Sequence, residues 1–287
     1  MADDIGAAGA LTLESEVTRA QTGDRAALET VVRAVQKDIL TLALRFLWHP
    51  QDAEDASQEI LVRIITHIGS YRGDSTFRTW VYRVACNALL TMRKQRMEQR
   101  AMSAAEFHED LMHGLSDDFV STPPAVDRAL LLEEVKIGCT LAMLLCLDRD
   151  HRLAYILGEI MELDHNEGSQ ILEITAAAYR KRLSRARTVI TSLMTSACGL
   201  IDRANACHCH KRVDTAVALG RVDPVHLLFA SSTEQARRFP RVLEEIDRLD
   251  KVRRAAALYR SHPEPTSSDA FSVWLRRLIV EREDLPQ

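Results

Sequence analysis

The sequence has no apolar run close to the about 20 residues that a membrane-spanning helix requires. Its first residues include Asp3 and Asp4 and no basic segment, so we do not expect a secretory signal. Six cysteines in 287 residues do not indicate a disulfide scaffold, which favours a reducing, cytoplasmic location. Glycine is rare within the periodic segments, and no strand-length alternation of apolar and polar residues occurs before residue 198. We therefore expect neither a membrane protein nor a strand-rich fold.

An excess of positive charge is also absent, because the net charge is −4. This balance argues against a protein that coats nucleic acid through bulk charge, but affinity for phosphates depends on where basic side chains cluster. The segment Arg78–Arg100 holds six basic residues against one acid, and Arg180–Arg187 holds five basic residues and no acid. Each cluster is either a solvated helix face or a local surface for phosphates.

Helical periodicity is the dominant pattern of the chain. Apolar residues recur at steps of three and four before residue 97 and again from residue 126 to about 197, with an irregular stretch between them. We predict an all-α fold with two small helical domains, a flexible linker and a mainly helical C-terminal extension. The predicted boundaries are a flexible tail (1–14), a first domain (15–97), the linker (98–127), a second domain (128–197) and the extension (198–287).

The strongest local motif is a predicted helix-turn-helix, with helices over 165–172 and 176–190. Thr175 is placed to cap the second helix, and the alanines that follow keep its first turn slim enough to approach bases in the major groove. Tyr179, Leu183 and Ala186 share one face and are expected to pack inward. The alternative is an ordinary helical hairpin with a basic outer face.

A second motif combines aromatic and basic residues at the start of the helix predicted near residue 76. Phe77 and Trp80 alternate with Arg78 and Arg83. Rings that stack on unpaired bases and cations that hold the backbone form a platform for single-stranded DNA. The alternative is that Phe77 and Trp80 are core residues at helical spacing.

A third motif is the acidic segment over residues 52–59. Acids in the first turns of a helix interact favourably with its dipole, which is sufficient to explain them on a solvated face. The alternative is a docking surface for a basic partner.

These motifs occur in order: Asp52-Ala53-Glu54-Asp55-x-x-Gln58-Glu59, Phe77-x-x-Trp80 with Asn87, and Arg182-Leu183-x-Arg185-Ala186-Arg187 after the helix-turn-helix. Together, over about residues 15–194, the chain resembles an extracytoplasmic-function (ECF) sigma factor of bacterial RNA polymerase. The resemblance implies a protein that is not an enzyme and needs no cofactor. Its implied partners are core RNA polymerase, promoter DNA and, in some cases, an anti-sigma protein, and no membrane.

The resemblance also assigns roles to residues. The first domain would bind polymerase and melt the minus-ten promoter element, the second would read the minus-thirty-five element, and the linker would pass through the polymerase. The implied polymerase contacts are Asp52, Asp55, Gln58 and Glu59. The implied minus-ten contacts are Phe77, Arg78, Thr79, Trp80, Arg83, Asn87, Arg93 and Lys94. The implied minus-thirty-five contacts are Thr175, Ala176, Ala178, Arg180, Lys181, Arg182 and Arg185.

Three positions depart from the pattern of the family. Thr91 stands where many relatives have an acid, Leu147-Asp148 replaces the usual Leu-Pro, and the segment 168–172 differs from the usual first helix of the motif. These departures affect the expected promoter preference more than the expected fold.

The C-terminal extension contains the one metal-like pattern in the sequence. Cys198, Cys207, Cys209 and His210 supply three thiols and an imidazole, a set that suits tetrahedral zinc. A redox pair and cysteines buried as small apolar residues are the alternatives. Cys86, Cys139 and Cys146 are expected in the core. By resemblance to sigma factors with such extensions, the unit is expected to regulate the protein in cis. The alternative is that it binds a ligand or another protein.

Two other functions are consistent with parts of the sequence. A helix-turn-helix regulator that acts without polymerase would not need the acidic and aromatic–basic motifs together. A metal- or thiol-dependent redox enzyme centred on the extension would be expected to show a Cys-x-x-Cys, a glycine-rich loop or paired catalytic acids, and the sequence has none of them.

Overall fold

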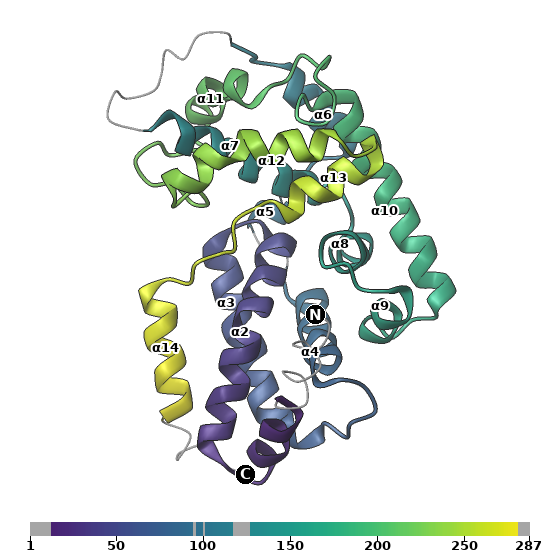
Figure 1. The fold of residues 1–287 in the computed structure, drawn as a ribbon, viewed down its shortest axis with the longest axis vertical. Helices are drawn as coiled ribbons and strands as arrows, with labels where there is room; N and C mark the ends of the chain where they lie inside the picture. Colours follow the sequence, from purple (N-terminus) through teal and green to yellow (C-terminus); the bar gives the residue numbers. More distant parts are fainter. Residues whose placement is uncertain (1–12, 94–95, 100, 117–126, 281–287) are drawn as a thin grey trace.

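The computed structural model describes residues 13–93, 96–99, 101–116 and 127–280. Helices joined by turns and loops make up these residues, which contain no strand apart from one isolated bridge between Cys198 and Cys207. The predicted all-α fold is confirmed (Figure 1).

The N-terminal helical group comprises residues 13–93. A helix over residues 13–21 precedes α2 (Arg25–Leu47), α3 (Pro50–His67), the short helix η1 (Ile68–Ser70) and α4 (Phe77–Thr91). Pro50 occupies the first turn of α3, where its missing N–H breaks no helical hydrogen bond. The Thr76 side chain accepts a hydrogen bond from Thr79 N and caps α4, as predicted. Residues 13 and 14, predicted to be part of a flexible tail, are helical, and residues 1–12 lie outside the described part of the chain.

The described part of the predicted linker is folded. It contains α5 (Arg96–Gln99) and α6 (Ala104–Met112). Ser103 and Glu106 form a reciprocal capping box at the start of α6, and Phe107 and Leu111 are buried. The described part of the predicted linker is therefore helical at α5 and α6, and apolar side chains of α6 pack against α10.

The helix-turn-helix group comprises α7 (Arg128–Leu144), α8 (Arg149–Tyr155), a π-helical turn η2 (Ile156–Ile160), α9 (His165–Ile171) and α10 (Ala176–Ala197). The extension adds α11 (Cys209–Ala218), α12 (Thr233–Asp247), α13 (Lys251–Arg260) and α14 (Asp269–Val280). Helices α11 and α12 pack on α7, and α13 packs on α10 and η2. Helix α14 leaves this layer and lies along α2 and α3 of the N-terminal group (Figure 1).

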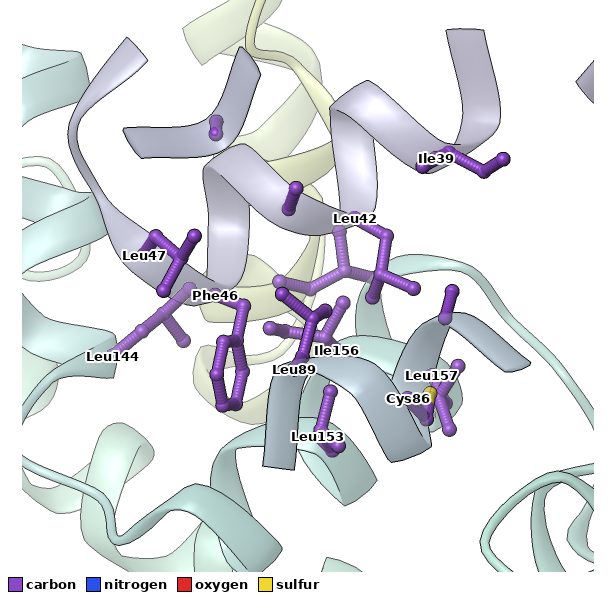
Figure 2. Packing of buried hydrophobic residues seen from close by; sticks show 14 of the residues in the cluster. Ile39, Leu42, Phe46, Leu47, Cys86, Leu89, Leu144, Leu153, Ile156 and Leu157 are labelled. Carbon is purple, nitrogen blue, oxygen red and sulfur yellow. The ribbon is translucent and has the colours of Figure 1, made fainter. Parts of the chain in front are cut away.

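One hydrophobic core joins the two groups and the extension. Figure 2 shows side chains of α2 and α4 meeting those of α7, α8 and η2. Phe46, Leu89, Leu153 and Ile156 have no exposed surface at this junction. Burying one such side chain stabilises the fold by about 1.5–3 kcal/mol. The packing therefore holds the helix-turn-helix group against the N-terminal group.

A buried ionic network reinforces the same junction. Arg149 and Arg152 of α8 both pair with Glu98, at 2.7 and 3.0 Å. The Arg152 guanidinium also donates to Phe46 O at the end of α2, at 2.7 Å. The Arg149 guanidinium donates to three carbonyls at the end of α4, those of Leu89, Leu90 and Met92. The last carbonyls of two helices in one group are thus satisfied by arginines from the other.

Candidate nucleic-acid interface

The start of α4 carries a three-ring cluster. The Phe77 and Trp80 rings stack with centroids 5.5 Å apart, and Tyr71 meets Phe77 edge-on at 5.3 Å. Phe77 is completely buried, whereas Trp80 is half-buried at the edge of the cluster. Trp80 is therefore the ring of the predicted platform that is open to a base, and Phe77 supports it from below.

Thr79 is buried at 3% exposure, because it lies on the inner face of α4. The prediction that Phe77 and Thr79 contact DNA does not fit this structure, since neither side chain reaches solvent. For Phe77 the structure agrees with the alternative of a core residue at helical spacing.

The basic residues of α4 lie on its outer side. The Arg78 side chain is exposed and pairs with Asp38 of α2 at 2.9 Å. Arg93 is exposed, and Lys94 lies outside the described residues. The position of Arg78 at the first turn of α4 leaves its guanidinium available to a phosphate that replaces Asp38.

Two predicted minus-ten residues contact the helix-turn-helix group. Arg83 Nε donates to Gln170 O at 3.2 Å, and Asn87 Nδ2 donates to Glu173 Oε2 at 3.1 Å. Helix α9 accordingly packs against α4. Glu173 was not predicted as a functional residue, since its neighbour Asn87 is 86 positions away in the sequence.

The helix-turn-helix has the geometry that its sequence predicts. Thr175 accepts a hydrogen bond from Ala178 N and caps α10, while Glu173 forms the turn at a φ of 52°. Tyr179 packs so closely on Gly168 that a Cβ there would lie 2.2 Å from a ring carbon. Glycine is therefore required at this crossing of α9 and α10. The inward face is confirmed as Tyr179, Leu183 and Ala186.

The outward face of α10 is basic. Arg180, Lys181 and Arg185 are exposed. Arg182 is half-buried and donates to Asp150 of α8 at 2.9 Å, and Arg187 pairs with Glu159. Thr175 is exposed, and Ala176 and Ala178 are partly exposed at the slim first turn. The three exposed cations and this first turn form one surface that suits a duplex.

The acidic face of α3 is also accessible. Asp55 and Glu59 are exposed, and Asp52 and Gln58 are half-buried beside them. Asp55 accepts from the Gln51 side chain at 3.1 Å, and Glu59 pairs with Arg63 along the helix. Such exposed pairs contribute little to stability, so these carboxylates are free to exchange partners.

Glu54, between them in sequence, faces the extension instead. It is 8% exposed and accepts hydrogen bonds from Ser268 N at 2.5 Å and Ser268 Oγ at 2.7 Å. Lys37 of α2 pairs with Glu264 of the same segment, and Phe271 of α14 is buried. The extension thus holds the helix pair α2 and α3 through charged and apolar contacts together.

The predicted zinc site is not supported. Four cysteines line a cavity of about 20 Å³ between α7, the end of α10 and α11, namely Cys139, Cys198, Cys207 and Cys209, and His210 is not among the lining residues. No group of three or more potential ligands in the described ranges is arranged to hold a metal ion. Burial raises the pKa of the Cys207 thiol to about 11, so the thiol is neutral near pH 7. The contacts therefore favour cysteines that act as small apolar residues.

Among the helices of the described residues, none combines the length and the apolar character needed to span a bilayer.

Comparison with known proteins gives one consistent family. The sequence model of Sigma-70 region 2 matches residues 31–98. The RNA polymerase sigma-H factor of Pseudomonas aeruginosa (strain PAO1) is 33% identical over 181 residues, which cover 61% of this chain and 89% of the relative. The ECF RNA polymerase sigma-E factor of Escherichia coli (strain K12) is 30% identical over 183 residues, which cover 63% of this chain and 93% of the relative.

The solved structure of CnrH in complex with the cytosolic domain of CnrY is 19% identical, with a TM-score of 0.45, and the match covers 63% of this chain and 95% of that one. The identity to the curated relatives extends over most of their length. The chain therefore belongs to the family of ECF RNA polymerase sigma factors.

Proposed function

We propose that this protein binds core RNA polymerase through the acidic face of α3 and directs it to promoters in the cytoplasm. As a sigma factor it is an initiation factor and not an enzyme. The observation that carries the proposal is the presence of three separate surfaces in one fold: the acidic face of α3, the Trp80 edge of α4 and the basic face of α10.

The start of α4 is proposed to capture the minus-ten element as a single strand. Extruding a base from the duplex costs a few kcal/mol, which stacking of about 1–3 kcal/mol per base and phosphate contacts can offset. Trp80 supplies the accessible ring, Arg78 and Arg93 supply cations, and Arg83 and Asn87 supply hydrogen-bond donors. Phe77 and Thr79 act only through the packing of this surface.

Helix α10 is proposed to read the minus-thirty-five element as a duplex. Its slim first turn can approach base edges, while Arg180, Lys181 and Arg185 neutralise phosphates and release counterions. Arg182 would leave Asp150 to join them. This contact anchors the complex and does not itself separate the strands.

We further propose that the structure is a closed form. Two elements centred near minus ten and minus thirty-five are about 25 base pairs apart, or roughly 85 Å along straight DNA at about 3.4 Å per base pair. In this structure α4 and α9 are in direct contact, so one molecule cannot hold both elements at once. The chain between residues 93 and 127 spans roughly 100 Å only when extended, so an open form of that length requires α5 and α6 to leave α8 and α10 and unfold.

The extension is proposed to regulate this opening in cis. Helices α11 to α13 pack on the helix-turn-helix group, whereas α14 packs on α2 and α3 of the N-terminal group. The extension thus bridges the two parts that must separate, and its last helix lies beside the acidic face of α3. Competition between α14 and polymerase for this side of the N-terminal group would couple polymerase binding to opening.

Run-off transcription reconstituted from core polymerase and the purified chain tests the proposal. A helix-turn-helix regulator that acts without polymerase would bind promoter DNA alone and would not restore initiation to the core enzyme. Activity of the full chain, dependent on the basic residues of α10, would support a sigma factor.

A further inference from the structure

The helix over residues 13–21 packs against the segment that leads into α4. Val17 and Ala20 are buried on its inner side. Glu14 and Gln21 lie on the same side, since they are spaced by three and four residues from Val17. This helix therefore presents two polar side chains to the start of the proposed single-strand platform.

Glu14 makes two hydrogen bonds there. Its Oε1 accepts from Phe77 N at 2.9 Å, and its Oε2 accepts from the Tyr71 hydroxyl at 2.9 Å. Phe77 is the first residue of α4, so its N–H has no partner within the helix. A carboxylate at this end of the helix also interacts favourably with the helix dipole. Glu14 thus adds a second set of contacts, beside the Thr76 cap, at the start of α4.

Tyr71 transmits the contact to the rings. Its ring meets Phe77 at 5.3 Å and Trp80 at 5.9 Å. The single proton of the Tyr71 hydroxyl is shared between Glu14 and Ser75 O, which lies at 2.7 Å, and Gln21 Nε2 donates to Tyr71 O at 2.8 Å. Burial and the Glu14 hydrogen bond raise the pKa of Tyr71 to about 12, so its hydroxyl stays protonated as a donor. Side chain and main chain of Tyr71 are therefore both held by the N-terminal helix.

We propose that Glu14 is a positioning residue for promoter melting, because it orients Tyr71 and the first turn of α4 so that Trp80 stands ready to receive an unpaired base. The inference rests on the proposed function of α4 and deepens it. The residue lies in a segment that composition alone marks as a tail, and the proposed role requires no contact between Glu14 and DNA or polymerase. Its role is to lower the reorganisation needed when the strand separates.

The test uses the full chain with core polymerase and a promoter that the unmodified chain selects from a randomised DNA library. Run-off transcripts are compared on the duplex promoter and on a copy with mismatches that open the minus-ten element. The variants are Glu14→Ala, Glu14→Gln and Tyr71→Phe. Glu16→Ala is the matched control, since Glu16 lies on the same helix and pairs with Arg19 at 2.9 Å.

Glu14→Ala should lower the ratio of duplex to pre-opened transcription about tenfold, because it loses two hydrogen bonds to a charged group. Glu14→Gln retains an acceptor, so its ratio should lie between those of Glu14→Ala and the unmodified chain. Tyr71→Phe should also lower the ratio, and Glu16→Ala should leave it unchanged. An unchanged ratio, or an equal loss on both templates, would overturn the inference and leave Glu14 with a structural role only. If thermal unfolding shows that Glu14→Ala does not fold, the ratio measured for Tyr71→Phe serves as the test instead. Failure of the unmodified chain on both templates would instead refute the proposed function.

Discussion

Glu98 of α5, in the segment that follows the N-terminal group, is buried between two arginines of α8. Its carboxylate pairs with Arg149 and Arg152, and each guanidinium also donates to main-chain carbonyls. Removing one member of a buried ionic network leaves the remaining charges without full compensation, which is more costly than replacing the whole network. This residue therefore controls how firmly the N-terminal and helix-turn-helix groups are joined.

Glu98→Gln should lower the free energy of unfolding by about 3 kcal/mol, because two buried guanidinium groups lose the charge that faces them. Urea denaturation followed by far-ultraviolet circular dichroism measures this change. Glu29→Gln is the control, since Glu29 forms an exposed pair with Arg33 and should change stability by less than about 0.5 kcal/mol. Equal, small effects of the two substitutions would show that the network is not important for the junction.

The residues of the interface differ in how well sequence predicts them. Thr175 and the exposed Arg180, Lys181 and Arg185 follow from capping and helical spacing and are found as predicted. Glu173 does not, because its partner Asn87 comes from a distant helix. Local patterns fix which side of a helix is polar, whereas pairs between helices depend on the tertiary packing.

At the level of helices, the start of α4 is well predicted from sequence. The helix is expected near residue 76, and the structure places the Thr76 cap there. The predicted second helix over 176–190 in fact continues to Ala197, because Leu193, Met194 and Ala197 pack into the core. Helix α6 was not predicted, because it has few apolar residues and these are buried only by packing against α10, a helix distant in sequence.

Helix α14 is an element whose role sequence does not reveal. Its apolar side was recognisable, but the surface that it covers belongs to α2 and α3, more than 200 positions away. Ending the chain before the extension would expose the core side chains that Leu258 and Tyr259 cover, since both of these residues are fully buried. A shorter deletion is therefore the sharper experiment.

A chain that ends at Pro263 lacks Glu264, Ser268 and α14 but keeps α11 to α13. We expect it to bind core polymerase about fivefold more tightly, because the polymerase no longer has to displace α14. A tenfold change in affinity corresponds to about 1.4 kcal/mol of binding free energy. Fluorescence anisotropy with labelled core enzyme measures the affinity. Ser268→Ala, which removes one hydrogen bond to Glu54, should give a smaller gain in the same direction. Weaker or unchanged binding of the shortened chain would contradict regulation by α14.

On the scale of the whole molecule, the fold class follows from composition and periodicity, but the closed arrangement does not. The helices of both groups contribute to one core, and α4 and α9 touch. Opening must expose apolar side chains, so the free energy of binding to polymerase has to compensate for their exposure. The closed form therefore predicts that opening requires the polymerase.

Energy transfer between fluorescent amino acids at Thr91 and Asn166 should report this opening. Both positions are exposed and lie within two helical turns of the Asn87–Glu173 hydrogen bond. We expect high transfer in the free chain and low transfer once core polymerase is added. A second pair at Thr30 and Arg63, within the N-terminal group, is the control and should not change. Low transfer in the free chain would mean that the groups are already separated.

The three surfaces are proposed to serve one initiation complex, and run-off transcription from a library-selected promoter is the decisive assay for this. With purified core polymerase, we expect specific transcripts when the chain is present and none with core enzyme alone. Replacing Lys181 and Arg185 together by alanine should abolish these transcripts. Promoter binding by the chain without any stimulation of the core polymerase would contradict the proposal.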